Sequence, residues 1–326
     1  MTIRSSNSWE TTTQSSLVSI ETHSLFLSTS GPPRTPGIPV VIFFTGGGAP
    51  AAVYIRLQAV LAAFARVYFY DRAGYGQSEM SPVAHPTAED AAEELHTLLA
   101  TVNVAPPYLL VSHSYGSLIA REFLALQNRL ASRAAPGASA PIAGMVLAEA
   151  ATEMMHAVFA APMPPPEFAT VTAGVDFARL THLREESRLS DEEWEEAIRA
   201  TERTERGSKA EDTRGSGRPL AAKQQFRLQA MGQQPLSVIR CDMAKDYKIM
   251  YEAGVKAGNG SEEERAVVRW FIETWELFDD ELRAAQLRLS GKSRYRVELE
   301  YGHDFPVRNP EVIVDEVKWV FKELGL

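Results

Sequence analysis

Short apolar runs alternate along most of the chain with longer segments in which apolar residues recur every three to four positions. Runs without polar interruptions are typical of strands buried on both faces of a parallel sheet, and the longer pattern is typical of amphipathic helices. The alternation predicts an α/β fold in which helices cover both faces of a mostly parallel central sheet. The predicted strands are residues 17–20, 25–28, 40–44, 67–70, 108–111, 142–148, 236–240 and 295–300.

The alternation stops after residue 150 and resumes near residue 235. We therefore expect a core made of residues 15–150 and 235–326, with a helical insertion, residues 151–234, lying over the sheet. A polar N-terminus, residues 1–14, is expected to be flexible. Residues 207–219 are charged and rich in glycine, and predict a mobile loop within the insertion.

Helix starts carry their own signals. Thr87 is a predicted cap, and both Ser190 and Ser261 are followed three residues later by Glu, the capping-box spacing. These caps predict helices over 87–99, from 190 toward 206, and from 261 in pieces to 289. A last helix is expected over 310–324.

Composition narrows the class of protein. Hydrophobic residues make up 45% of the 326 residues, enough for a sizeable core. The net charge is −9 with no basic face, which argues against nucleic acid as a partner. One cysteine, Cys241, excludes a disulfide within the chain, and no apolar stretch is long enough for a membrane span. We expect a cytoplasmic protein, and the sequence leaves a homodimer open.

Ser114 stands where a buried strand meets a helix. It is flanked two residues away by the small residues Ser112 and Gly116, as a sharp strand–serine–helix turn requires. The N-terminus of the following helix directs its free backbone N–H groups at the serine, where they can stabilise developing negative charge. Taken alone, the pattern also fits a serine in an ordinary loop, since the usual motif has Gly at the position of Ser112; in a strand–turn–helix context it predicts a serine held at a tight, strained turn.

A serine hydroxyl needs an adjacent base to act as a nucleophile at neutral pH. Among seven histidines, His303 lies in a tight loop, residues 301–306, between the last predicted strand and helix. A loop at the end of a central sheet can reach another strand end. His113 is next to the serine, so its side chain is expected to point away from the proton to be removed.

With these segments in place, the chain resembles an α/β-hydrolase-fold protein with a helical cap after the sixth strand. The resemblance rests on residues 40–48, 67–78, 108–116, 142–149 and 302–306, in the family's order. It implies that Ser114 attacks an acyl carbon and that His303 serves as general base and then general acid. It also implies an oxyanion hole made by the backbone N–H of Tyr115 and one from Gly46 or Gly47.

The resemblance leaves the acid of the triad open between two places. In most members the acid follows the seventh strand, here near Ala244, with Asp242 and Asp246 on either side. In others it ends the sixth strand, where this chain has Glu149. We favour Glu149, with Asp242 as the alternative.

The expected function is a serine hydrolase that cleaves an ester or lactone of a fairly apolar small molecule through an acyl-enzyme. Met154, Met155 and Phe159 of the insertion are candidates for its substrate pocket. No metal-ligand spacing and no nucleotide-binding glycine pattern is present, so no cofactor and no metal is expected. Two alternatives stay open: a lyase, cyclase or acyltransferase on the same fold, and a ligand-binding sensor.

Overall fold

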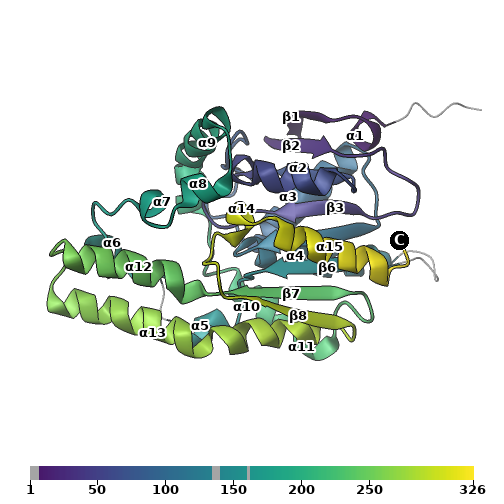
Figure 1. The fold of residues 1–326 in the computed structure, drawn as a ribbon. Helices are drawn as coiled ribbons and strands as arrows, with labels where there is room; N and C mark the ends of the chain where they lie inside the picture. The colour runs from purple at the N-terminus through teal and green to yellow at the C-terminus, as the bar shows by residue number, and fades with distance from the viewer. Residues whose placement is uncertain (1–6, 134–139, 160–161) are drawn as a thin grey trace, which may run out of the picture.

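The computed structural model describes residues 7–133, 140–159 and 162–326. Its centre is one eight-stranded sheet in the order β1-β2-β4-β3-β5-β6-β7-β8 (Figure 1). The predicted α/β fold is confirmed, and each predicted strand is present. The strands are β1 Gln14–Ser19, β2 Ser24–Ser30, β3 Val40–Phe44, β4 Val67–Tyr70, β5 Tyr108–His113, β6 Ile142–Ala148, β7 Leu236–Cys241 and β8 Ser293–Glu298.

The central strands of the sheet are parallel to one another and fully buried. β1 and β2 pair antiparallel, β2 pairs antiparallel with β4, and every later pair is parallel. All residues of β3, β4 and β5 are buried, as expected for strands covered on both faces. Their carboxyl ends therefore meet at one edge of the sheet, where the loops after β3, β5, β6 and β8 gather.

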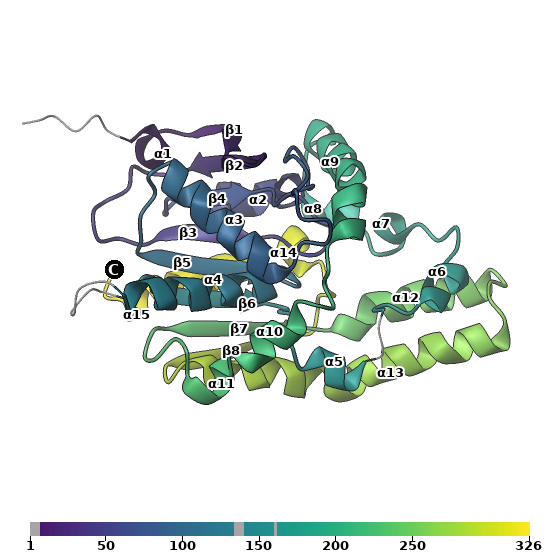
Figure 2. The same ribbon diagram turned by 180° about the vertical axis from the view of Figure 1, so that it is seen from behind.

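Alternate residues of the central strands face different helices. Val41 and Phe43 pack with α2 (Ile55–Ala62) and α15 (Glu311–Glu323), whereas Ile42 and Phe44 pack with α3 (Ala88–Thr101) and α4 (Gly116–Ala131). Figures 1 and 2 show these two helical layers on opposite faces of the sheet. The period of two along each strand thus divides the core into two apolar layers.

The predicted caps are confirmed. Thr87, Ser190 and Ser261 each accept from the backbone N–H three residues ahead, opening α3, α9 (Asp191–Ala210) and α13 (Glu262–Ala284). The remaining elements are α1 Ser8–Thr11, η1 Ala51–Tyr54, α5 Met155–Val158, α6 Pro166–Val171, α7 Phe177–Leu180, α8 Leu183–Ser187, α10 Gly217–Ala222, α11 Gln225–Leu228, α12 Met243–Lys256, η2 Ala285–Leu289 and α14 Phe305–Arg308.

Between β6 and β7 the described residues form helices α5–α11 and no strand. The loop predicted over 207–219 is shorter than expected, residues 211–216, because α9 continues to Ala210 and α10 begins at Gly217. A Cβ on Gly207 would lie 2.2 Å from the carbonyl oxygen of Gly74. Glycine is therefore required at position 207 because two backbones approach closely there, and not because the chain turns. That residues 151–234 act as a cap stays a prediction.

A second helical excursion, between β7 and β8, was not predicted in full. Asp242 caps α12, which packs against α13, and the pair extends beyond the sheet with α6 beside it (Figures 1 and 2). The signal was available: Met243, Tyr247 and Met250 follow helical spacing directly after an Asp cap.

Of the N-terminal residues 1–14, residues 1–6 lie outside the described part. Residues 8–11 form α1 rather than an irregular chain. The carbonyl oxygen of Trp9 accepts from the Arg66 guanidinium and the Tyr68 hydroxyl, which ties this helix to β4.

Candidate active site

Ser114 occupies the turn between β5 and α4 in a left-handed conformation, with φ +51°. Such a conformation costs a non-glycine residue about 1–3 kcal/mol and is maintained by its surroundings. A Cβ on Gly116 would lie 2.4 Å from the carbonyl oxygen of Phe44, so only glycine fits there. Ser112 and Ser117 share a hydrogen bond of 2.9 Å between their buried hydroxyls beneath the turn, so serine is accommodated at both positions.

His303 meets Ser114 from the other end of the chain. It lies in the loop between β8 and α14, and its Nε2 is 3.0 Å from the Ser114 Oγ. Burial lowers the pKa of His303 well below its usual value, and His113 and the Arg283 guanidinium lower it further. A neutral imidazole at hydrogen-bond distance can accept the hydroxyl proton.

Two backbone N–H groups beside Ser114 have no hydrogen-bond acceptor within the described residues: those of Tyr115 and Gly47. The two residues are adjacent, since a Cβ on Gly47 would lie 3.7 Å from the Tyr115 Cβ. Gly46, the other predicted donor, has its N–H engaged by the Tyr54 hydroxyl at 3.3 Å. Two free donors next to a nucleophile are the arrangement that an oxyanion hole requires.

Glu149 is buried at the end of β6, also with a left-handed φ of +45°. One carboxylate oxygen accepts from the backbone N–H of Cys241 at 2.6 Å, and the other forms an ion pair with Arg283. Burial raises the pKa of this carboxyl, and Arg283 opposes the rise. Arg283 therefore acts electrostatically on both Glu149 and His303.

No carboxylate of the described residues is hydrogen-bonded to the His303 Nδ1, which is buried without a hydrogen-bond partner there. Asp242 accepts from the backbone N–H of Lys245 at 3.1 Å, as the cap of α12. Asp246 lies against the loop backbone, since a Cβ on Gly302 would be 2.0 Å from its Oδ2. The structure thus brings Ser114 and His303 together, and within the described residues no carboxylate is hydrogen-bonded to the His303 Nδ1.

His113 contributes contacts that the sequence did not indicate. As expected, it is not hydrogen-bonded to the Ser114 hydroxyl; instead its Nε2 donates to the His303 carbonyl oxygen at 2.9 Å. Its Nδ1 lies 2.8 Å from the Tyr54 hydroxyl. Burial lowers the pKa of His113 to about 4, so this ring is neutral and joins the histidine loop to the loop of Gly46.

That Met154, Met155 and Phe159 line the substrate pocket stays a prediction. Phe159 packs on Trp275 of α13, with ring centroids 4.3 Å apart, and Met154 and Met155 border neither of the two cavities that follow. Two mainly apolar cavities adjoin the site. One of about 330 Å³ is bordered by Gly47, Val307 and the Leu189, Trp194, Ala197 and Ile198 side chains. Another of about 260 Å³ is bordered by His303, Phe168, Phe177, Met243, Tyr247 and Met250.

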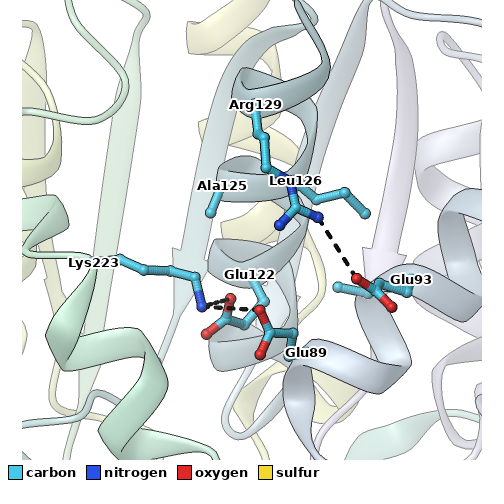
Figure 3. A pocket seen from close by; sticks show the side chains of 8 residues that line it. Glu89, Glu93, Glu122, Ala125, Leu126, Arg129 and Lys223 are labelled. Carbon is cyan, nitrogen blue, oxygen red and sulfur yellow. Dashed lines mark hydrogen bonds and ion pairs between the residues drawn. The ribbon is translucent and has the colours of Figure 1, made fainter.

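A third hollow, between α3 and α4, contains none of the candidate residues. Figure 3 shows Lys223 reaching Glu89 and Glu122, at 3.3 and 2.8 Å, and Arg129 facing Glu93. The charges in this hollow are paired with one another, which indicates a structural role.

A family model described as the alpha/beta hydrolase family matches residues 41–316. The chain belongs to this family. An AB hydrolase superfamily protein from Gibberella zeae is 32% identical to it over 308 residues, 91% of each chain.

Solved structures of other alpha/beta hydrolases share the fold at low identity. An esterase from Thermogutta terrifontis is 17% identical with a TM-score of 0.56, covering 96% of this chain and all of its own. A serine hydrolase involved in carbazole degradation is 15% identical with a TM-score of 0.56, covering 95% and 99%. Within the described residues, no helix has the length and apolar character to cross a membrane.

Proposed function

We propose that this alpha/beta hydrolase cleaves an ester or lactone of a fairly apolar small molecule through a covalent acyl-enzyme. The observation that carries the proposal is the 3.0 Å contact between Ser114 Oγ and His303 Nε2, beside the free N–H groups of Tyr115 and Gly47. These groups supply a nucleophile, a base and two oxyanion donors at one point.

In the proposed mechanism, His303 takes the hydroxyl proton as Ser114 attacks the carbonyl carbon. The carbonyl oxygen becomes negative and accepts from Tyr115 and Gly47, and His303 then protonates the leaving alcohol. Water, deprotonated by the same imidazole, releases the acid from Ser114. Glu149 is proposed as the acid that stabilises the imidazolium, on its carboxylate chemistry and its burial at the end of β6.

A fluorophosphonate tests this proposal directly. It should label the native protein once, on Ser114, and the label should be absent from Ser114→Ala. Turnover of a chromogenic ester in ¹⁸O-water should place one labelled oxygen in the released acid. Labelling that persists in Ser114→Ala would refute the proposal, and product without ¹⁸O would favour transfer or lyase chemistry on the same residues.

The cavity beside Gly47 supports an apolar acyl group, because its lining is mainly apolar. Ala197 lies in this lining on α9. Ala197→Trp should therefore lower kcat/KM for an octanoyl ester about tenfold or more relative to an acetyl ester. The matched control is Arg199→Trp on the exposed side of α9. An unchanged chain-length profile in Ala197→Trp would show that the acyl group binds elsewhere.

The pH profile tests the link between Arg283, Glu149 and His303. Arg283 lowers the pKa of both groups, so Arg283→Gln should raise both and move the acidic limb of kcat/KM to higher pH. Arg240→Gln, which breaks an ion pair with Asp279 on the same helix, should leave the limb in place. An acidic limb that stays or moves to lower pH in Arg283→Gln would contradict this electrostatic arrangement.

A further inference from the structure

Arg72, in the loop after β4, contacts the segment that carries the proposed oxyanion donor. Its Nη1 donates to the Thr45 carbonyl oxygen at 3.1 Å and to the Thr45 hydroxyl at 2.9 Å. Its Nη2 donates to the Gly46 carbonyl oxygen at 3.0 Å. The carbonyl of Gly46 and the N–H of Gly47 belong to one planar trans peptide, in which they point in opposite directions. Because Arg72 holds that carbonyl, the Gly47 N–H points away from Arg72.

The charge of Arg72 is balanced by Glu211, which lies in the segment between β6 and β7. Glu211, the C-cap residue that follows α9, accepts from Arg72 Nε at 2.6 Å and from Nη2 at 3.1 Å. The side chains are 3% and 6% exposed. Tyr75 donates to the same carboxylate at 2.9 Å and accepts from the Gly48 N–H at 3.0 Å. A buried guanidinium without this partner would be strongly unfavourable.

Glu211 reaches Arg72 because α9 packs against the loop after β4. The Thr204 hydroxyl accepts from the Gly76 N–H at 2.9 Å. One turn further along α9, Gly207 meets Gly74 so closely that a Cβ on either would overlap the other's backbone. The ion pair of Arg72 and Glu211, the Arg72–Glu211 latch, therefore forms only when α9 is docked in this position.

We propose that the Arg72–Glu211 latch couples the docking of α9 to the orientation of the Gly47 N–H, so that the oxyanion hole is complete only with α9 in place. Arg72 and Glu211 are positioning residues, since neither contacts the reacting atoms. This inference rests on the proposed function and adds that a residue outside the triad controls transition-state stabilisation.

A purely structural ion pair would behave differently. Replacing both members of a buried pair with apolar residues of similar volume is often neutral for stability. A structural latch would then be replaced without loss of activity. A positioning latch would not, because even in a stable protein the Thr45 carbonyl would lose the Arg72 donor and the Gly46 carbonyl would keep only the longer contact, 3.4 Å, from the Ala49 N–H.

The test compares Glu211→Gln and the double variant R72M/E211M with Glu196→Gln, which breaks an exposed pair with Arg203 on the same helix. Each full-length variant is assayed for kcat, KM, melting temperature and inhibition by a trifluoromethyl ketone, whose hemiketal oxyanion occupies the hole. Glu211→Gln should lower kcat about 10- to 100-fold and weaken the ketone by the same factor, because one donor is misdirected. KM should change less than about threefold, because ground-state binding does not use this donor.

The double variant should keep the melting temperature and still show the low kcat. Native-like kcat and ketone affinity in either Glu211→Gln or R72M/E211M would overturn the latch while leaving the proposed function intact. Native protein that turns over no ester and takes no fluorophosphonate would overturn both. Glu196→Gln should match the native protein in all four measurements.

Discussion

Ser114→Ala and His303→Ala are each expected to lower kcat by about 10⁴- to 10⁶-fold, and the double variant no further. The reason is that the hydroxyl and the imidazole, 3.0 Å apart, act as one unit. Removing either leaves the other without its function, while the Tyr115 and Gly47 donors still give residual catalysis. The measurement is kcat for a chromogenic ester in the three variants at equal folded fraction.

The control for this experiment is Ser112→Ala. The Ser112 hydroxyl bonds Ser117 beneath the turn and is buried, so its loss should cost stability rather than chemistry. Losses that add in the double variant would mean that Ser114 and His303 do not act in the same step. A Ser112→Ala variant as slow as Ser114→Ala would mean that the turn, rather than the hydroxyl, had been lost.

Ser114 and His303 could be predicted from the sequence because their signals are local. A strand that is apolar throughout, a serine between small residues and a helical pattern occupy one short segment, and the steric need for Gly116 follows from the turn itself. The loop of His303 is likewise bounded by a strand and a helix. The carboxyl ends of parallel strands lie at one edge of the sheet. These local signals therefore suffice to predict that Ser114 and His303 lie at the same edge.

The surroundings of the site could not be predicted because they depend on contacts between distant segments. Hydrophobicity indicates that Phe159 is buried, but only the fold shows that its ring packs on Trp275. Residues 207–219 have the composition of a loop. The close approach of Gly207 to Gly74 depends on how α9 docks, which the sequence does not show. The Glu149–Arg283 pair joins β6 to a helix that follows β7.

Glu149→Gln is expected to lower kcat by about 10³- to 10⁴-fold, the scale for loss of the acid behind a catalytic histidine. Glutamine has the same shape but no charge to stabilise the imidazolium. Glutamine is chosen over alanine because it keeps an oxygen for the Cys241 N–H, while its neutral amide leaves Arg283 partly compensated by Asp279. The measurement is kcat, with circular dichroism and a melting curve to establish the folded fraction.

Asp242→Ala should show the opposite pattern. Asp242 caps α12 through the Lys245 N–H, so its loss should cost about 0.5–2 kcal/mol of stability and leave kcat near the native value. The two variants therefore separate a charge that acts on His303 from a carboxylate that holds a helix end. If Asp242→Ala lost kcat and Glu149→Gln kept it, the acid would follow β7 as in most relatives. The Glu149–Arg283 pair would then serve only to anchor α13 at the end of β6.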